Sequence, residues 1–290
     1  MEEKPLNETA EQPPTDELLH ELEQVSRSVG DMQEQLNRTR KLEKLLTDLT
    51  EFRDQSWWVH VKAACEREKD LLKSFREQGH SAIQSVETLY READAKVRSV
   101  IQNLPGEFER AAKSESISLD FSRSRHPKYL FSESGFIEVL INDKKQNARI
   151  STREGNLGTL PADAGAILEK VKAEDERLFG RKFNGKRFLA DLRAAYLAAI
   201  KAKKTDDGEP VPIREVFNSL SGRTKAYKGY KKDEFLVDLS KLVQEGPAET
   251  DGLRFELQQT KDTAEGMLLL GVAGRGMVNL LIFRKPDKTS

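Results

Sequence analysis

A heptad pattern near the N-terminus constrains the fold of this chain more than any other feature. Its apolar residues are spaced 4-3-4-3-4: Leu18, Leu22, Val25, Val29, Met32 and Leu36. This spacing keeps one narrow stripe on one side of a helix, as in a coiled-coil seam. Glu21, Glu23 and Arg27 make the other faces too polar for burial. We therefore predict that the stripe mediates oligomerisation, with a core-facing helix of a globular bundle as the alternative.

The composition favours long helices that are only partly buried. Of the 290 residues, 33% are charged and 37% are hydrophobic, which is more charge than a compact chain usually carries. A helix that buries one stripe leaves its other faces in water and accounts for this surplus. Helical spacing continues from Leu42 to Phe52, and a second helix is predicted from about Ser56 to Asn103, with a weak point at Gly79-His80. Pro105-Gly106 is expected to end it.

The arrangement of these two helices stays open. They form either an antiparallel hairpin that turns near 53–56, or one long bent helix that pairs with another chain. Trp57 and Trp58 are adjacent at this point. Neighbours on a helix point about 100° apart, so both rings cannot face one seam. We interpret the pair as a packed helix junction, with an interface anchor as the alternative.

Charge and cysteine content restrict the function classes. The net charge is −1, so nucleic acid can be bound only through a local patch. Cys65 is the single cysteine, which rules out an internal disulfide and is typical of a reducing compartment. The sequence has no apolar run of about 18 residues, and its acidic, proline-containing start is unlike a signal peptide. We expect a cytoplasmic protein that does not enter a membrane.

The middle of the chain, 115–182, is predicted to form a small β unit followed by a helix. Segments that alternate or are rich in β-branched residues are expected to be strands: 117–121, 128–131, 136–142 and 148–152. A turn at 143–146 connects the last two. Gly155–Gly158 is expected to lead into a helix over 161–179 that begins with Pro161.

One face of the return strand at 148–152 is predicted to be basic. Alternation places Arg149, Ser151 and Arg153 on the same side. Further cations are close in the sequence: Arg123, Arg125, Lys128, Lys144 and Lys145. We interpret this patch either as a contact for nucleic acid or phosphate, or as a solvated sheet face.

The C-terminal third has a distinctive order of elements. Helices are predicted first, then strands: helices at 188–203, 212–220 and 232–244, a strand at 253–257, and a hairpin of 267–272 with 277–283. This order over Arg187–Lys285 resembles a winged helix-turn-helix domain. The resemblance implies that the third helix occupies the position that enters the major groove of DNA.

A basic connector, 223–232, precedes the predicted third helix. It contains five cations, two tyrosines and no acid. This composition suits phosphate contacts combined with hydroxyl or stacking contacts. With the tip of the expected wing, it supplies the predicted DNA-binding residues: Arg223, Lys225, Tyr227, Lys228, Tyr230, Lys231, Lys232 and Arg275. A solvated loop or a protein-facing patch is the alternative. Asp233, Glu234 and Asp238 in the helix itself favour DNA contact with little sequence specificity, or a protein partner.

No catalytic residue, cofactor or metal site is predicted. The four histidines are widely scattered: His20, His60, His80 and His126. Together with Cys65 they form no zinc-binding pattern, and a phosphate loop ending in Gly-Lys-Ser or Gly-Lys-Thr is missing. Asp120 and Glu138 lie on predicted strands, where a metal-dependent nuclease would need acids. However, Leu140 stands where such a site often has a lysine.

These patterns predict a mainly helical α+β protein. Its expected parts are a disordered tail (1–14), coiled-coil helices (15–110), the β unit with its helix (115–182) and a winged-helix-like domain (186–286). We expect a non-enzymatic subunit of a multiprotein assembly. Its helices would bind another copy or a coiled-coil protein, and its C-terminal domain would bind double-stranded DNA or a partner protein. The alternatives are a dimeric transcriptional regulator and, third, a nuclease.

The layout is loosely similar to the kleisin-type subunits of chromosome-organising ATPase complexes. Kleisins combine N-terminal helices with a C-terminal winged helix, and they bridge a coiled-coil neck and an ATPase head. The similarity implies an ATPase subunit as a partner, and a bacterial defence complex built around such an ATPase as one setting. The chain departs from this pattern in its middle, where strands are predicted in place of a long flexible linker.

Overall fold

A computed structural model describes residues 15–115, 117–132, 135–223, 227–262, 264–271 and 277–286, apart from the side chains of 15–17 and 223. These residues form eight helices and two antiparallel sheets, which confirms the predicted mainly helical α+β class. The chain divides into two compact units. We call their described parts the helical unit (15–56 and 61–94) and the mixed unit (57–60 and 95–286). The predicted tail, 1–14, lies outside the described residues.

The N-terminal half is helical but more interrupted than predicted. Its helices are α1 (Thr15–Asp54), α2 (Trp58–Arg67), α3 (Lys69–Glu77) and α4 (Ala82–Ser114). The prediction of a single second helix is therefore wrong, because three helices cover that stretch. The weak point at Gly79-His80 is confirmed. Gly79 has a φ of 70°, a left-handed conformation that glycine adopts without strain just after the end of α3.

The predicted helix end at Pro105-Gly106 is also wrong, because α4 continues through it to Ser114. A proline inside a helix costs about 3 kcal/mol. On either side of the proline, Leu104, Phe108 and Ala112 are fully buried in the core of the mixed unit. Burying a side chain the size of leucine or phenylalanine contributes about 1.5–3 kcal/mol. Packing therefore outweighs the helix-breaking effect of the proline.

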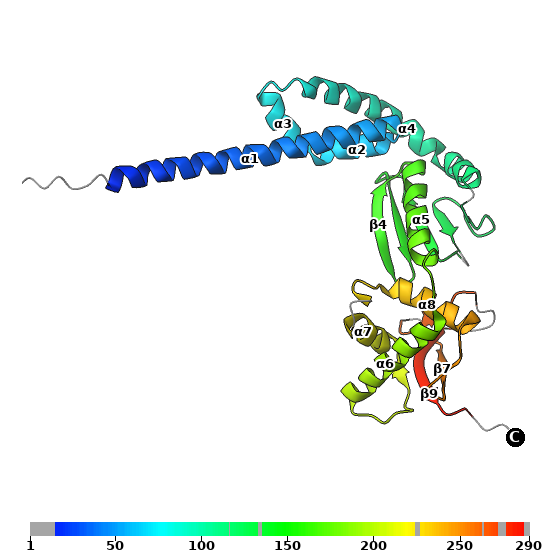
Figure 1. Ribbon diagram of the computed structural model, residues 1–290. Coiled ribbons are helices and arrows are strands. Elements are labelled where there is room, and N and C mark those ends of the chain that lie inside the picture. The colour runs from blue at the N-terminus through cyan, green and yellow to red at the C-terminus, as the bar shows by residue number, and fades with distance from the viewer. Residues whose placement is uncertain are drawn as a thin grey trace, which may run out of the picture. The chain divides into compact units, whose positions relative to one another are not determined.

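Within the helical unit, the chain turns back on itself after α1. This helix ends at Asp54, and Ser56 has a φ of 58° in the turn that follows. Leu42 of α1 packs against Phe75 and Ile83 in a small buried cluster. Of the two arrangements that the sequence left open, the helical unit has the one that folds back, with α3 beside α1 (Figure 1).

The first sheet of the mixed unit is an antiparallel meander. Its strands, in spatial order, are β1 (Lys128–Phe131), β2 (Ile137–Asn142), β3 (Asn147–Thr152) and β4 (Gly155–Pro161). Alternation turns Tyr129, Val139 and Ile150 into the core. The helix α5 (Ala164–Phe179) contributes Ile167 and Val171 to the same core and lies along the sheet in Figure 1.

Three details of this sheet differ from the prediction. Residues 117–121, all of them described, form no strand, and Leu119 makes only an isolated bridge with Phe131. The segment 155–161 is a strand. Its two glycines suggested a loop, because glycine is uncommon in strands. Helix α5 begins at Ala164 rather than at Pro161, because Pro161 pairs with Asn147 as the last residue of β4.

The C-terminal part of the mixed unit combines three helices with the second sheet. The helices are α6 (Gly185–Lys203), α7 (Ile213–Arg223) and α8 (Lys232–Glu245). The strands are β5 (Val211–Pro212), β6 (Glu249–Thr250), β7 (Leu253–Thr260), β8 (Met267–Leu268) and β9 (Met277–Arg284). Their spatial order is β5-β9-β7-β6, and β8 also pairs with β9. The three predicted helices in this region are thus confirmed.

The predicted C-terminal hairpin is correct only in part. Met267 and Leu268 pair with the start of β9, but the long partner of β9 is β7, from Arg254↔Arg284 to Thr260↔Met277. Consecutive residues of β9, 281–283, are buried. Because consecutive residues of a strand point to opposite faces, β9 is covered on both faces of the sheet. It is also a central strand, since it pairs with β5 along one edge and with β7 along the other.

Candidate functional site

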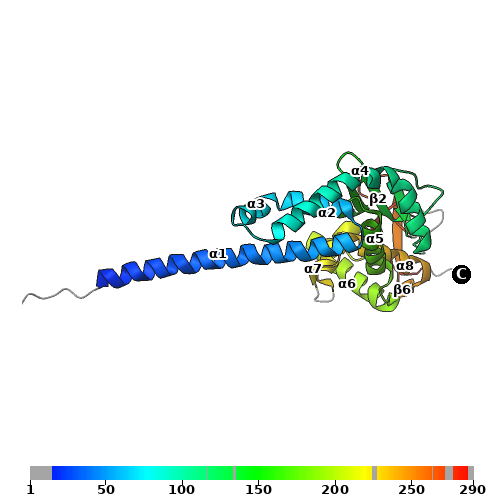
Figure 2. The same cartoon turned by 90° about the horizontal axis from the view of Figure 1, so that it is seen from above.

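The predicted oligomerisation seam is an exposed apolar stripe on α1. The exposed fractions of its members are 44–72%: Leu18, Leu22, Val25, Val29, Met32 and Leu36. Farther along the same helix, Leu42, Leu45 and Leu49 are each 2% exposed. In Figures 1 and 2, the N-terminal part of α1 extends beyond α2 and α3. The described residues therefore bury the second half of the apolar pattern and leave the first half uncovered.

The positions beside the seam carry little charge. Glu21 is charged, but the other polar residues that flank the seam in the heptad are neutral: Ser26, Ser28, Gln33 and Gln35. Farther round the helix, Arg27 pairs with Glu23 at 3.5 Å and Arg38 pairs with Glu34 at 2.5 Å. Such exposed pairs, one turn apart, contribute about 0.3–0.5 kcal/mol each to a helix. They support α1 without placing charge next to the apolar stripe.

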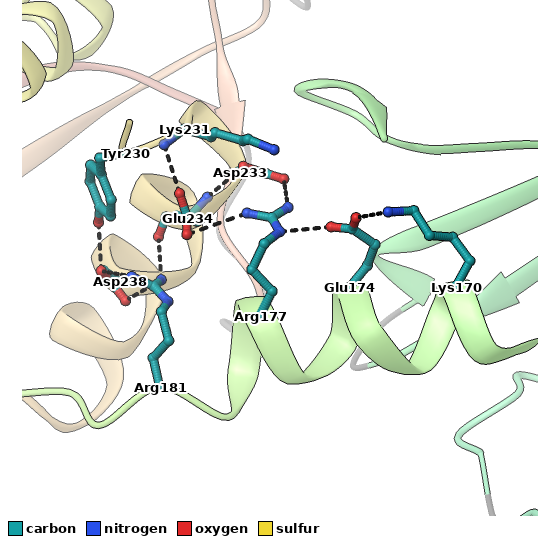
Figure 3. A network of polar contacts seen from close by, with 9 residues as sticks. All are labelled: Lys170, Glu174, Arg177, Arg181, Tyr230, Lys231, Asp233, Glu234 and Asp238. Carbon is teal, nitrogen blue, oxygen red and sulfur yellow. Dashed lines mark hydrogen bonds and ion pairs between the residues drawn. The ribbon is translucent and has the colours of Figure 1, made fainter. Parts of the chain in front are cut away.

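A network of ion pairs joins α5 to α8 in the mixed unit (Figure 3). Arg177 in α5 donates to Glu174 at 2.7 Å and to Asp233 at 2.5 Å, and it lies 3.3 Å from Glu234. Arg181, just after α5, contacts both carboxylate oxygens of Asp238 at 3.0 and 3.2 Å. Tyr230 donates to the same carboxylate at 2.5 Å, and Lys170 donates to Glu174 at 2.6 Å. Each acid of the network thus has a basic partner.

Burial and pairing have opposite effects on the protonation of this network. Burial raises the pKa of Asp238 above its ordinary value, although Tyr230 and Arg181 oppose the shift. Burial acts in the same direction on Glu174, but hydrogen bonds from Lys170 and Arg177 outweigh it and lower the pKa of that carboxyl. Burial opposes the charge of Arg177, and its bonds to Asp233 and Glu174 nevertheless raise its pKa. The guanidinium therefore stays charged at the centre of the network.

The network lies on the helix that the winged-helix resemblance assigns to the DNA groove. Asp233 and Asp238 are only 4% and 8% exposed, and every residue from Phe235 to Ser240 is buried. A helix that reads bases must present an open face to their edges. In the described structure, α8 instead directs its acids at α5. This arrangement explains the acidic residues that the sequence placed there.

The predicted DNA-contacting connector is divided between internal and exposed side chains. Tyr227 donates to Asp191 at 2.8 Å, and its ring lies 5.1 Å from that of Tyr230, which donates to Asp238. Burial is the main cause of the raised pKa of both phenols. Three lysines of the predicted set are exposed: Lys228, Lys231 and Lys232. Lys225, Arg275 and the side chain of Arg223 lie outside the described residues.

The acids considered for a nuclease site are paired with neighbouring cations. Glu138 lies 2.6 Å from Lys128, and Asp120 lies 2.5 Å from Arg123. Hydrogen bonds from Ser122 and Arg123 lower the pKa of Asp120 to about 2. Among the described residues, no group of three or more His, Cys, Asp or Glu side chains could hold a metal ion. None of the described helices combines the length and the apolar composition that crossing a membrane requires.

The structure brings part of the predicted basic patch together. One hollow of about 330 Å³ between the first sheet and the segment Leu268–Leu270 is lined by four of these cations: Arg123, Lys128, Arg149 and Arg153. Ser151 lies in the same hollow. The other cations predicted for the patch do not line it: Arg125, Lys144 and Lys145. Sequence alternation therefore predicted the basic face of the strand correctly. Which cations line the hollow depends on the tertiary fold.

The junction around the two tryptophans contains a polar residue that sequence reasoning missed. Asp163 accepts hydrogen bonds from the backbone N–H groups of Val59 and His60 at 3.2 and 2.8 Å, and its carboxylate lies 2.7 Å from His60 Nδ1. Trp57 lies so close to Gly165 that a Cβ added there would be 2.8 Å from the indole nitrogen. The ammonium group of Lys96 lies 3.7 Å from the ring centre of Trp58. These contacts agree with a packed helix junction.

In comparisons with known proteins, no protein family, curated relative or solved structure matches this chain.

Proposed function

We propose that this protein is a non-enzymatic assembly subunit that self-associates through the α1 seam, Leu18–Leu36. The observation that carries this proposal is the exposure of all six seam residues, 44–72%, on a helix whose later apolar residues are buried. A second copy of the chain suits this surface because Glu21 is the single charged residue at the flanking positions within 18–36, so pairing of two identical helices brings few like charges together. The stripe is about 27 Å long, at 1.5 Å per helical residue.

The C-terminal part of the proposal is a winged-helix domain that contacts double-stranded DNA with little sequence specificity. It is supported by the element order α6, β5, α7, α8, β7, β9 and by the central position of β9 between β5 and β7. The exposed lysines Lys228, Lys231 and Lys232 supply the phosphate contacts. The covered face of α8 argues against the alternative of a sequence-specific regulator. The kleisin-like layout makes an ATPase subunit of a chromosome-organising or bacterial defence complex the further partner to test.

Self-association is tested on the full chain with Leu22→Asp combined with Val29→Asp. These substitutions place two carboxylates in the seam, where pairing would bury them without a cation. In light-scattering measurements, we expect the unaltered chain at a multiple of its 32.9 kDa mass and the double variant at 32.9 kDa.

The matched control is Gln24→Asp combined with Asn37→Asp, which adds the same charge to α1 away from the seam. We expect this control to keep the mass of the unaltered chain. A monomeric unaltered chain at every soluble concentration would contradict the proposal, and so would a seam variant that stays assembled.

A further inference from the structure

The hollow between the first sheet and the segment Leu268–Leu270 combines cations with an apolar wall. Its volume of about 330 Å³ lies at the lower end of the range for small-molecule sites. Its cations are Arg123, Lys128, Arg149 and Arg153. Its apolar lining includes Leu130 and the consecutive residues Leu268, Leu269 and Leu270. Such a lining suits a ligand with one anionic end and one less polar end.

The strand register explains why these cations converge. Arg149 in β3 is opposite Leu140 in β2, and Leu140 is opposite Lys128 in β1. Neighbouring strands are about 4.8 Å apart, so the backbones that carry the two cations are about 10 Å apart on one face. Arg153 follows directly after the end of β3. The side chains can therefore reach one small ligand from opposite sides.

Two of the four cations already have acidic partners, and the other two have none among the residues that the structure describes. Lys128 pairs with Glu138 at 2.6 Å, and Arg123 pairs with Asp120 at 2.5 Å. Neither Arg149 nor Arg153 forms an ion pair with any residue that the structure describes. Glu154, next to Arg153 in the sequence, pairs with Arg214 at 3.1 Å instead. The hollow therefore has two guanidinium groups available for an anion.

We propose that Arg149 and Arg153 bind the phosphate group of a phosphate ester of nucleotide size. A guanidinium presents a planar fork of donors that matches two phosphate oxygens, and the hydroxyl of Ser151 adds a further donor. A bare anion leaves the leucine wall unused, whereas the organic part of an ester packs against Leu268–Leu270. The ester is either a free nucleotide or a nucleotide within a single strand of nucleic acid.

The test is calorimetric titration of the full chain with four probes: adenosine monophosphate, adenosine, inorganic phosphate and a single-stranded oligonucleotide. We expect adenosine not to bind and inorganic phosphate to bind more weakly than the ester. Arg149→Gln combined with Arg153→Gln should weaken ester binding about 10-fold or more, because it removes two charge-assisted contacts. The control, Lys144→Gln combined with Lys145→Gln, removes the same charge from the nearby turn, outside the hollow, and should bind like the unaltered chain.

The outcomes separate the two sources of the ester. Arginine-dependent binding of adenosine monophosphate assigns the site to a free nucleotide, and arginine-dependent binding of the oligonucleotide alone assigns it to a strand. The proposal is overturned if the unaltered chain binds neither adenosine monophosphate nor the oligonucleotide. It is also overturned if the arginine double variant and the lysine double variant weaken binding equally. Arg149→Lys keeps the positive charge but removes the planar guanidinium, and it should also weaken binding of the ester. If this variant binds as tightly as the unaltered chain, the role given to Arg149 is wrong.

This site is independent of self-association, because it lies in the mixed unit and the α1 seam lies in the helical unit. The light-scattering test and the titration can therefore fail separately. The unfolding midpoint of each arginine variant is measured on the same samples, and we expect little change because both arginines are exposed.

Discussion

At the scale of single residues, Asp163 illustrates how one buried carboxylate can hold a junction together. It is 2% exposed and serves three donors: the N–H groups of Val59 and His60, and His60 Nδ1. The two backbone donors belong to the first turn of α2, where N–H groups lack partners within the helix. Asp163 thus caps α2 although it is more than 100 residues away in the sequence.

We predict that Asp163→Asn lowers the free energy of unfolding by about 1–3 kcal/mol. The amide of asparagine has nearly the shape of the carboxylate, but an NH₂ group replaces one of the two acceptor oxygens. This NH₂ group would face another hydrogen-bond donor, so a buried polar group would be left unsatisfied. Urea unfolding followed by circular dichroism measures the difference. Asp206→Asn, at an exposed position, is the control and should change the free energy by less than about 0.5 kcal/mol. Equal stability of the two variants would show that Asp163 does not hold the junction.

At the scale of elements, α5 and α8 are joined by charges as well as by apolar packing. Arg177 is at the centre, between Glu174 on its own helix and Asp233 and Glu234 on the other. Removing one partner of a buried ion pair is costly because the other charge stays buried without compensation. The contact between these helices therefore depends strongly on this one arginine.

We predict that Arg177→Met lowers the free energy of unfolding by about 3–5 kcal/mol. The control is Arg187→Met. Arg187 is 71% exposed and lies 3.8 Å from Asp191, so the expected loss of unfolding free energy is below about 1 kcal/mol.

The same ion pairs predict a dependence on pH. The pKa of Glu174 is lowered in the folded protein, so the stabilising contribution of this carboxylate is present above its ordinary pKa of 4.5 and is lost as the pH falls. In urea unfolding, the gap between Arg177→Met and the unaltered chain should therefore narrow in acid. A gap no larger than that of the control at pH 7 would refute this account.

At the scale of the whole molecule, the proposed self-association seam and the proposed DNA contact lie in different units and are expected to reinforce one another. An assembly held by the α1 seam would carry several copies of the lysines at 228, 231 and 232. Linked binding sites raise the apparent affinity without any new contact. A charge reversal at the lysines acts on the DNA contact itself, whereas a seam variant acts only through the number of linked copies.

We predict that the seam variant Leu22→Asp with Val29→Asp weakens binding to duplex DNA about 10-fold or more through this loss of linkage. Lys228→Glu with Lys231→Glu should weaken binding and flatten its dependence on salt, because fewer counterions are released, and should leave the assembled mass unchanged. Fluorescence anisotropy at several salt concentrations, combined with light scattering, measures both effects. Unchanged affinity and salt slope after the lysine substitutions would remove the connector from the DNA interface.

Local sequence patterns predicted much of this protein. Helical spacing identified α1 and the three C-terminal helices, and alternation or a high content of β-branched residues identified β1 to β3. The basic face of β3 followed from its alternation, because successive strand residues point to opposite faces. These features succeed because each depends on the periodicity of one element, which is set by neighbouring residues.

The features that sequence analysis missed depend on contacts between distant residues. Pro105 remains helical because Leu104 and Phe108 are buried in the core of the mixed unit. The main partner of β9 is β7, and not the segment that comes just before β9 in the sequence. The acids of α8 are turned inward by Arg177 and Arg181, so the helix order that resembles a DNA reader has no open reading face in the described structure.

For the candidate sites, local sequence patterns were enough to identify the apolar seam of α1 and the cations of the middle strands. The packing of the fold leaves this seam uncovered by the described residues, and it places Arg149 and Arg153, rather than Lys144 and Lys145, along a hollow. This difference arises because periodicity specifies which side of an element a residue occupies. What faces that side is set by the packing of other elements, which a local pattern does not contain.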